Sequence, residues 1–163
     1  MNKFYNFHPS LLREYDIRGI VNDTLSANDA RAIGAIFGSI VRNNGGQDIV
    51  VGRDGRHSSI EMEKSLIDGL ISQGLTVFSI GLCPTPQLYF GVYHLEADGG
   101  IMITGSHNPP DYNGFKLMLG HSPFFGQDIQ DMAKTPYDPA EIWQGGQQIQ
   151  LNIQEAYLGR VLE

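Results

Sequence analysis

Ser106 is the residue of this chain whose surroundings point most directly to chemistry. It lies in residues 104–116, which read Thr-Gly-Ser-His-Asn-Pro-Pro-Asp-Tyr-Asn-Gly-Phe-Lys. The apolar residues 100–103 favour a buried strand, whereas two prolines and the Asn113-Gly114 pair disfavour regular structure immediately after the serine. Ser106 is therefore predicted at the carboxyl end of a strand, where open α/β sheets usually bind ligands. A hydroxyl group in that position is suited to carrying a phosphoryl group.

A phosphorylated Ser106 would need nearby positive charge, because a phosphoserine carries about −1.5 to −2 charges at neutral pH. Lys116 supplies one cation if the strand predicted at residues 115–119 folds back, through an Asn113-Gly114 turn, beside the strand that ends at Thr104. At an effective dielectric near 20 and about 4 Å, each cation contributes roughly 4 kcal/mol of gross attraction before its own desolvation. We therefore favour a site role for Lys116 over a solvated strand lysine, and we expect a second cation or a metal ion.

His107 and Asn108 follow the serine directly and are candidate site residues for that reason. The imidazole of His107 can hydrogen-bond a phosphate or help to move the hydroxyl proton, which a free serine holds too tightly to react alone. A histidine that only braces the turn is an equally good interpretation. Both interpretations of His107 stay open, and Asn108 is a candidate substrate-binding residue.

Other serine and phosphate chemistries are disfavoured by the sequence around Ser106. A serine hydrolase needs Gly-x-Ser-x-Gly with a helix that begins at the nucleophile, but Pro109 pushes Asn108 away from helical angles. The glycine-rich motifs of nucleotide-binding loops do not occur in the sequence.

The composition describes a globular chain with an acidic surface. The 163 residues are 41% hydrophobic and 18% charged, with a net charge of −7. This charge argues against nucleic acid or an anionic membrane as a partner, and the absence of a long apolar run or a signal-peptide core favours a cytoplasmic location. Cys83 is the single cysteine, so an internal disulfide is impossible, and its neighbours Leu82 and Pro84 favour a buried packing thiol.

Strand and helix signals alternate along residues 15–119, which predicts an α/β domain with helices on both faces of a layered sheet. Ser26 and Asp29 begin the first helix, the pair Ser58 and Glu61 is predicted to cap the second, and Thr85 is predicted to cap the third. The expected strands are residues 15–19, 48–52, 76–80, 100–103 and 115–119.

Residues 104–116 closely resemble the active-site serine loop of the α-D-phosphohexomutases, in the phosphomannomutase and phosphoglucomutase branch. This resemblance implies a first domain with a mixed, mostly parallel sheet between helix layers, containing one antiparallel strand. It also implies that Ser106 exchanges phosphate with a hexose phosphate through a bisphosphate intermediate, with glucose 1,6-bisphosphate as the activating donor. The substrates would be glucose and mannose 1- and 6-phosphates. The family's Mg²⁺ would bind the phosphate of Ser106 and three aspartates of a second domain, and no Asp-x-Asp-x-Asp run occurs in this sequence.

Residues 15–19, Tyr-Asp-Ile-Arg-Gly, resemble a second family segment. The resemblance makes Arg18 the additional cation and Tyr15 a residue that touches the substrate. Alternation along a strand would send Tyr15 and Arg18 to opposite faces, so one simple strand does not bring both to the site. An ion pair between Asp16 and Arg18 on the surface is the alternative for Arg18.

Residues 52–56, Gly-Arg-Asp-Gly-Arg, resemble a third family segment at the end of a strand. Arg53 and Arg56 would frame the cleft in a functional interpretation. We favour the structural interpretation, in which an Arg-Asp network orders a loop and Ser58 caps the following helix.

The pattern weakens after Gly126. We assign residues 1–134 to a phosphohexomutase first domain and residues 135–163 to a linker and the start of a second domain, where Asn152 and Glu155 signal a new helix. The chain is therefore expected to be the amino-terminal part of a longer enzyme and to be inactive by itself, and its partners to be the remaining domains. The alternatives are a small complete protein, a phosphoserine domain that binds sugar phosphates or a partner without turnover, and a phosphoglucosamine mutase.

Overall fold

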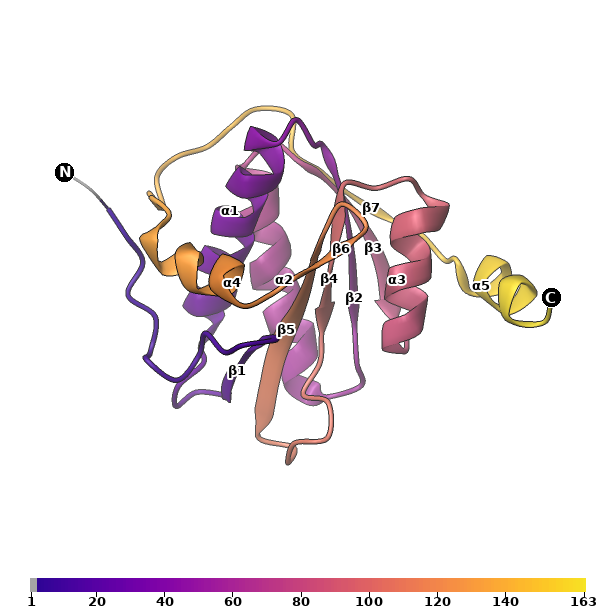
Figure 1. Ribbon diagram of the computed structural model, residues 1–163, viewed down its shortest axis with the longest axis horizontal. Coiled ribbons are helices and arrows are strands. Elements are labelled where there is room, and N and C mark those ends of the chain that lie inside the picture. The colour runs from indigo at the N-terminus through magenta and orange to yellow at the C-terminus, as the bar shows by residue number, and fades with distance from the viewer. Residues whose placement is uncertain (1–2) are drawn as a thin grey trace.

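A computed structural model describes residues 3–163 and shows one mixed β-sheet between two layers of helices (Figure 1). The strands are β1 (Ile17–Ile20), β2 (Asp48–Arg53), β3 (Thr76–Leu82), β4 (Gly99–Ile103), β5 (Tyr112–Leu119), β6 (Ser122–Phe124) and β7 (Gln147–Gln150). The helices are α1 (Ala27–Asn43), α2 (His57–Ser72), α3 (Thr85–His94), α4 (Gln127–Asp131) with a 3₁₀ turn at Met132–Lys134, and α5 (Gln154–Val161).

The sheet has the order β1-β5-β4-β2-β3-β7, and β6 pairs with β5. β5 runs antiparallel to β1, β4 and β6, whereas the pairs among β4, β2, β3 and β7 are parallel. Both the three-layer α/β/α class and the single antiparallel strand are therefore confirmed.

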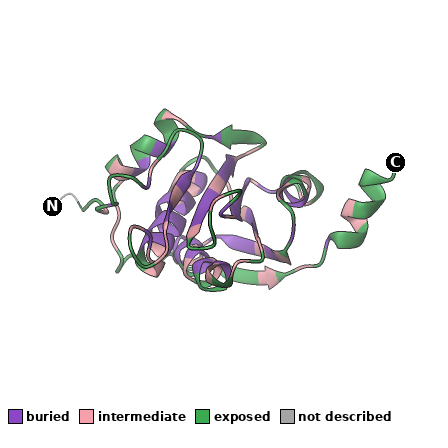
Figure 2. Cartoon of the chain, turned by 90° about the horizontal axis from the view of Figure 1, so that it is seen from below, coloured by how far each residue is buried: buried purple, intermediate pink, exposed green. Residues whose placement is uncertain are grey.

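Successive residues of the central strands point to opposite faces of the sheet and pack in two separate hydrophobic cores. Ile49, Val51 and Ile101 pack in the larger core with α1 and α2, while Val50 and Met102 pack in the smaller core under α3. Buried residues follow the strands and the inner faces of these helices (Figure 2), whereas α5 contains no buried residue. This two-sided burial is what a sheet covered on both faces requires.

The first helix begins as predicted, whereas the second and third do not. Ser26 and Asp29 form a reciprocal capping box at the start of α1. The residue that caps α2 is Arg56, in an extended conformation and without a side-chain cap, so the predicted Ser58–Glu61 box is wrong. A tertiary contact explains this difference, because the hydroxyl of Ser58 accepts a hydrogen bond from the side chain of Asn113 on β5. α3 is preceded by Pro84 and has no side-chain cap, so the predicted Thr85 cap is wrong.

Two further segments differ from the expectation. The Asn113-Gly114 pair lies inside β5, where both residues are buried and pair with β1, so the predicted turn is wrong. The polar residues 147–150 form β7 at the sheet edge beside β3. This strand lies in residues 135–163, which were expected to form a linker and the start of a second domain. The proposed domain boundary at residue 134 stays a prediction.

Tyr157 of α5 packs against Phe90 of α3 with ring centroids 5.6 Å apart, so these two helices lie side by side. Asn152 accepts a hydrogen bond from the backbone of Gln154, while the residue that precedes the helix is Ile153. None of the described helices is long and apolar enough to cross a membrane.

Candidate functional site

Ser106 lies in the connection between β4 and β5. We call this connection, together with the first residue of β5, the serine loop (residues 104–112). This loop follows the carboxyl end of β4 (Figure 1). Ser106 is exposed there, as predicted. Its backbone has φ +54° in the left-handed region, and its N–H donates to the hydroxyl of Thr104 over 2.9 Å. A non-glycine residue in this region costs on the order of 1–3 kcal/mol and persists only where its surroundings fix it.

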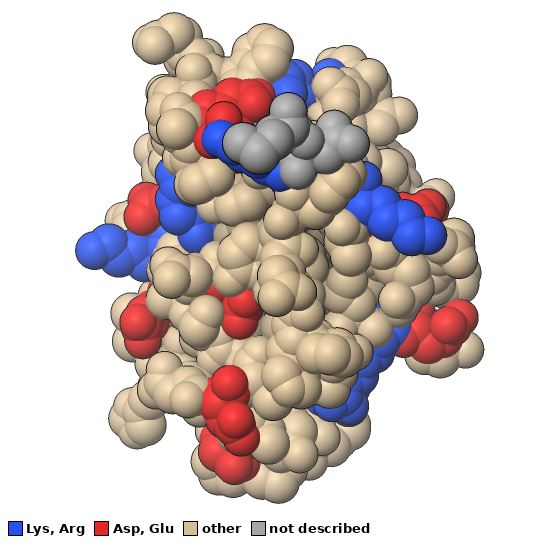
Figure 3. Space-filling model, turned by 90° about the vertical axis from the view of Figure 1, so that its left-hand side faces the viewer, with Lys and Arg blue, Asp and Glu red and all other residues tan. Residues whose placement is uncertain are grey.

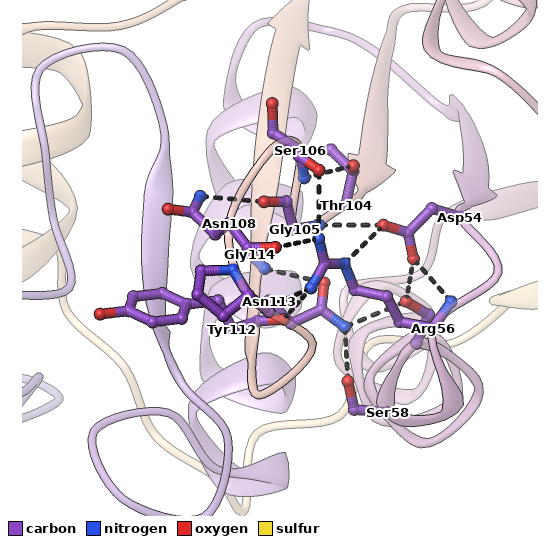
Figure 4. A network of polar contacts seen from close by, with 12 residues as sticks. Asp54, Arg56, Ser58, Thr104, Gly105, Ser106, Asn108, Tyr112, Asn113 and Gly114 are labelled. Carbon is purple, nitrogen blue, oxygen red and sulfur yellow. Dashed lines mark hydrogen bonds and ion pairs between the residues drawn. The ribbon is translucent and has the colours of Figure 1, made fainter.

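Arg56 supplies that fixation. Its guanidinium donates to four backbone carbonyl oxygens of the serine loop, at 2.6–3.1 Å: those of Ser106, Asn108, Pro109 and Tyr112. Its Nε also donates to the carboxylate of Asp54 over 3.2 Å. Figure 4 shows the side chain of Ser106 pointing away from this guanidinium. The predicted Arg-Asp network that orders a loop is thus present at Arg56.

Asp54 ties the same loop to the start of α2. One carboxylate oxygen accepts from the hydroxyl of Ser59 and the N–H of Arg56, and the other accepts from the N–H of Gly105 over 2.9 Å. Burial by itself raises the pKa of Asp54, but the hydrogen bonds from Ser59, Gly105 and Arg56 outweigh it and leave the pKa below its ordinary value. Asp54 is therefore held as an ionised partner for Arg56.

Gly105 allows Arg56 to approach the loop. A Cβ atom at this position would lie 2.2 Å from the guanidinium carbon and from Nε of Arg56. Because that guanidinium is held by several hydrogen bonds, it cannot move aside cheaply. A side chain at position 105 is thus excluded by contact rather than by backbone conformation.

Asn113 completes the frame from β5. Its buried side-chain amide donates to the hydroxyls of Ser58 and Ser59 over 2.8 and 3.0 Å, and its amide oxygen accepts from the N–H of Gly114. The start of α2 and the start of β5 are therefore fixed to each other beneath the serine loop (Figure 4).

Lys116 lies on the strand that folds back beside β4, as predicted. It is half-buried and pairs in register with Met102 of β4, while its neighbours Phe115 and Leu117 pack in the core with α1 and α2. Lys116 therefore faces the other side of the sheet, on which α3 lies.

Arg18 and Tyr15 lie in different surroundings, because the strand predicted to contain both begins only at Ile17. Arg18 lies on β1 opposite Gly114 and makes an ion pair of 2.7 Å with the carboxylate of Asp16. Tyr15 lies in a bend before the strand, is 75% exposed and stacks on Phe125. The ion pair between Asp16 and Arg18 that was considered as the alternative is present, but it is largely buried and not on the surface.

Of the remaining candidates, His107 and Asn108 lie in the serine loop, and Arg53 lies elsewhere, beside Glu63. His107 is exposed beside the serine, and the side chain of Asn108 donates to the carbonyl of Gly105, so Asn108 also braces the loop. Arg53 forms an ion pair with Glu63 over 3.6 Å and lines a cavity of about 510 Å³ with Gln87. The sequence analysis treated Arg53 and Arg56 together, but the two side chains have different partners, Glu63 and Asp54.

Sequence reasoning anticipated the Arg-Asp network to which Asp54 belongs, because Asp54 follows a buried strand in the Gly-Arg-Asp-Gly-Arg segment. It missed Asn113 as a member of the site. The hydrogen bonds of Asp54 to the N–H of Gly105 and of Asn113 to the hydroxyl of Ser59 join residues about 50 positions apart, and no local pattern encodes them.

Charged side chains of both signs are dispersed over the face of the molecule drawn in Figure 3. On the face drawn in Figure 3, Lys and Arg side chains are interspersed with Asp and Glu and do not gather into one basic patch. That face lacks the electrostatic footprint of a nucleic-acid interface.

A mixed sheet between helix layers that presents an exposed, conformationally fixed serine beyond a parallel strand defines a three-layer domain with a candidate nucleophile. The chain belongs to the phosphoglucomutase and phosphomannomutase family: residues 9–137 match the family model described as phosphoglucomutase/phosphomannomutase, alpha/beta/alpha domain I.

Individual relatives agree with this assignment. A phosphomannomutase/phosphoglucomutase of Pseudomonas aeruginosa is 48% identical over 121 residues, which cover 74% of this chain and 26% of the relative. The Pseudomonas syringae pv. tomato protein of the same name is 40% identical over 152 residues, or 93% and 33% of the two chains. The crystal structure of a Burkholderia thailandensis family protein superposes with a TM-score of 0.87 at 38% identity, and covers 96% of this chain and 36% of that chain. The chain thus spans about a quarter to a third of the length of these curated relatives.

Proposed function

We propose that this chain is the phosphoserine-carrying domain of a phosphohexomutase, which moves phosphate between C6 and C1 of a hexose phosphate. The observation that carries the proposal is the exposed hydroxyl of Ser106 on a loop fixed beyond β4, in a domain of the phosphoglucomutase and phosphomannomutase family. Glucose and mannose phosphates are the proposed substrates, consistent with the names of the relatives.

The reaction would use Ser106 twice. In the first transfer, a sugar hydroxyl oxygen bonds to phosphorus while the bond between phosphorus and Oγ of Ser106 breaks, and the proton of the sugar hydroxyl ends on Oγ. The resulting hexose 1,6-bisphosphate turns over. In the second transfer, Oγ bonds to the other phosphorus and gives its proton to the leaving sugar oxygen, which releases the isomeric monophosphate. Such a reaction asks the protein mainly for alignment and for compensation of charge on the phosphoryl oxygens.

The chain offers specific groups for these tasks. Lys116 and Arg18 would compensate the charge of the phosphoserine, and Tyr15 and Asn108 would contact the sugar. The exposed imidazole of His107, adjacent to the serine, would either hydrogen-bond the phosphate or carry the exchanged proton. These assignments rest on the match between the chain's motifs and the family's.

Mg²⁺ is the proposed metal, although this chain does not form a metal site from its own side chains. Among residues 3–163, no three His, Cys, Asp or Glu side chains lie close enough together to hold a metal ion. The contribution of the chain would be the phosphate oxygens on Ser106, with aspartates supplied from elsewhere. When bound, the ion would neutralise part of the phosphate charge.

We also propose a cytoplasmic enzyme that uses glucose 1,6-bisphosphate as the phosphate donor for activation. Turnover would require the further domains that the longer relatives contain, with residues 1–134 as the first domain and residues 135–163 leading into the second. The chain alone would then carry phosphate without completing the mutase cycle.

The experiment compares Ser106→Ala with Ser122→Ala, which removes an exposed hydroxyl on β6. Both variants are made in the protein expressed from its complete coding sequence and assayed with glucose 1-phosphate and mannose 1-phosphate. We expect Ser106→Ala to abolish conversion to the 6-phosphates without a change in thermal stability, and Ser122→Ala to match the wild type. Retained turnover in Ser106→Ala would contradict the proposal.

A further inference from the structure

The guanidinium of Arg56 has no N–H left to give to a ligand. A guanidinium has five N–H donors. Here Nε donates to Asp54, one terminal nitrogen donates to Pro109 and Tyr112, and the other donates to Ser106 and Asn108. Each donor therefore has an acceptor within this protein, and the positive charge is paired with the Asp54 carboxylate.

These contacts control which backbone groups of the serine loop face outward. Carbonyl oxygens carry partial negative charge and repel a phosphate, and four carbonyls of this loop point to one cation instead (Figure 4). The side chain of Ser106 points the other way. Arg56 thus holds four of the loop's carbonyl oxygens on the side away from the hydroxyl that would receive the phosphoryl group.

We infer that Arg56 is a positioning residue for phosphoryl transfer. It keeps Ser106 in its left-handed conformation, and it holds the loop's carbonyl oxygens away from the phosphate. It acts through the loop and does not touch the substrate. The inference rests on the proposed function, because it assigns a role within that reaction.

Gly105 makes the inference testable without removal of the arginine. A methyl group at position 105 would overlap the guanidinium carbon, which it would approach to 2.2 Å. Gly105 does not have the positive φ that would itself exclude alanine. Gly105→Ala should therefore displace Arg56 from the loop and act like Arg56→Ala, and it should have little additional effect once Arg56 is already absent.

Lysine should not replace Arg56. Its ammonium group has three donors on one nitrogen and lacks the planar fork that reaches acceptors on both sides. If the loop needs only a positive charge at position 56, Arg56→Lys should behave like the wild type. If the loop needs the planar guanidinium, Arg56→Lys should be defective like Arg56→Ala.

The experiment uses the protein expressed from its complete coding sequence, with Arg56→Ala, Arg56→Lys, Gly105→Ala and the double variant Arg56→Ala/Gly105→Ala. Arg160→Ala is the control, because the side chain of Arg160 is 74% exposed on α5. Two readouts are taken: amide hydrogen exchange in residues 104–112, and the rate at which glucose 1,6-bisphosphate phosphorylates Ser106, followed by mass spectrometry.

We expect faster exchange in the loop and about 100-fold slower phosphorylation in each single variant at position 56 or 105, because misplacement of a reacting group by about 1 Å costs on that order. The KM for the sugar phosphate should change less than kcat. The double variant should resemble Arg56→Ala alone, since the two changes break one contact.

Wild-type exchange and wild-type phosphorylation in Arg56→Ala would overturn the inference, as would full rescue by Arg56→Lys or additive effects in the double variant. If Arg56→Ala does not fold, Gly105→Ala decides the question, since it retains the arginine. If Ser106 in the wild type never accepts phosphate, the proposed function fails, while the exchange data still report whether Arg56 fixes the loop.

Discussion

Arg18 on β1 and Lys116 on β5 are diagonal neighbours on the same face of the sheet. The register pairs Arg18 with Gly114, two residues from Lys116, and such diagonal neighbours lie about 7–8 Å apart. Ile17 and Phe115 pack on the opposite face, in the core with α1 and α2. A chain with a net charge of −7 thus places two cationic side chains on one face of β1 and β5, and β5 begins where the serine loop ends.

Lys116→Met should lower kcat and slow the phosphorylation of Ser106. Loss of one group that stabilises transition-state charge costs on the order of 100-fold in kcat. Steady-state kinetics measure the effect, with Lys64→Met on the exposed face of α2 as the control. Kinetics equal to those of the wild type would make Lys116 an ordinary strand lysine.

The ion pair between Asp16 and Arg18 should stabilise the fold as well as orient the arginine. Asp16 is 7% exposed, so Arg18→Gln leaves a buried carboxylate without its partner and should cost about 1–3 kcal/mol in the free energy of unfolding. In the double variant Asp16→Asn/Arg18→Gln, part of that loss should return. Urea denaturation measures the cycle, and strictly additive losses would show that the two side chains act independently.

Acid should weaken the wild type through Asp54. Because its pKa in the folded protein is below the ordinary value of 3.8, the unfolded chain binds the proton more readily. The stabilisation is fully present above that ordinary value and is lost as pH falls through the lower pKa of the folded state.

Asp54→Asn isolates this contribution. At neutral pH the variant should be about 1–3 kcal/mol less stable, since Asn cannot accept all the hydrogen bonds from Gly105, Ser59 and Arg56. The gap between the two proteins should narrow as pH falls. A gap that is constant across the acid range would show that ionisation of Asp54 does not contribute.

Cys83 should be inert in the native protein. The thiol is 7% exposed, and burial raises its pKa to about 11, so the thiolate fraction at about pH 8 is small. A colorimetric thiol reagent should react slowly with the folded protein and rapidly after denaturation. Rapid reaction in the native state would contradict the packing role that both sequence and structure indicate.

Where the deciding interactions are local, the sequence predicted the structure well. The capping box at Ser26 and Asp29 and the end of β4 just before the serine loop both follow from neighbouring residues. Each depends on periodicity or on turn chemistry within a few positions. The position of Ser106 at a strand end therefore follows from the residues on either side of it.

The frame under the loop could not be predicted in the same way. An Asn-Gly pair usually signals a turn, but here the amide of Asn113 binds Ser58 and Ser59, and Gly114 lies so close to β1 that a Cβ would be 2.1 Å from the carbonyl oxygen of Ile17. Long-range contacts thus outweighed the local preference. The same contacts took Ser58 away from its predicted capping role.

Phosphate on Ser106 is the central claim, and peptide mapping by mass spectrometry tests it most directly. The protein is expressed from its complete coding sequence and mapped as purified, after incubation with glucose 1,6-bisphosphate, and after a chase with glucose 1-phosphate. We predict one phosphate on the peptide that contains Ser106 after loading, its decrease during the chase, and none in Ser106→Ala. An unmodified Ser106 under all three conditions, or phosphate confined to another residue, would contradict the account.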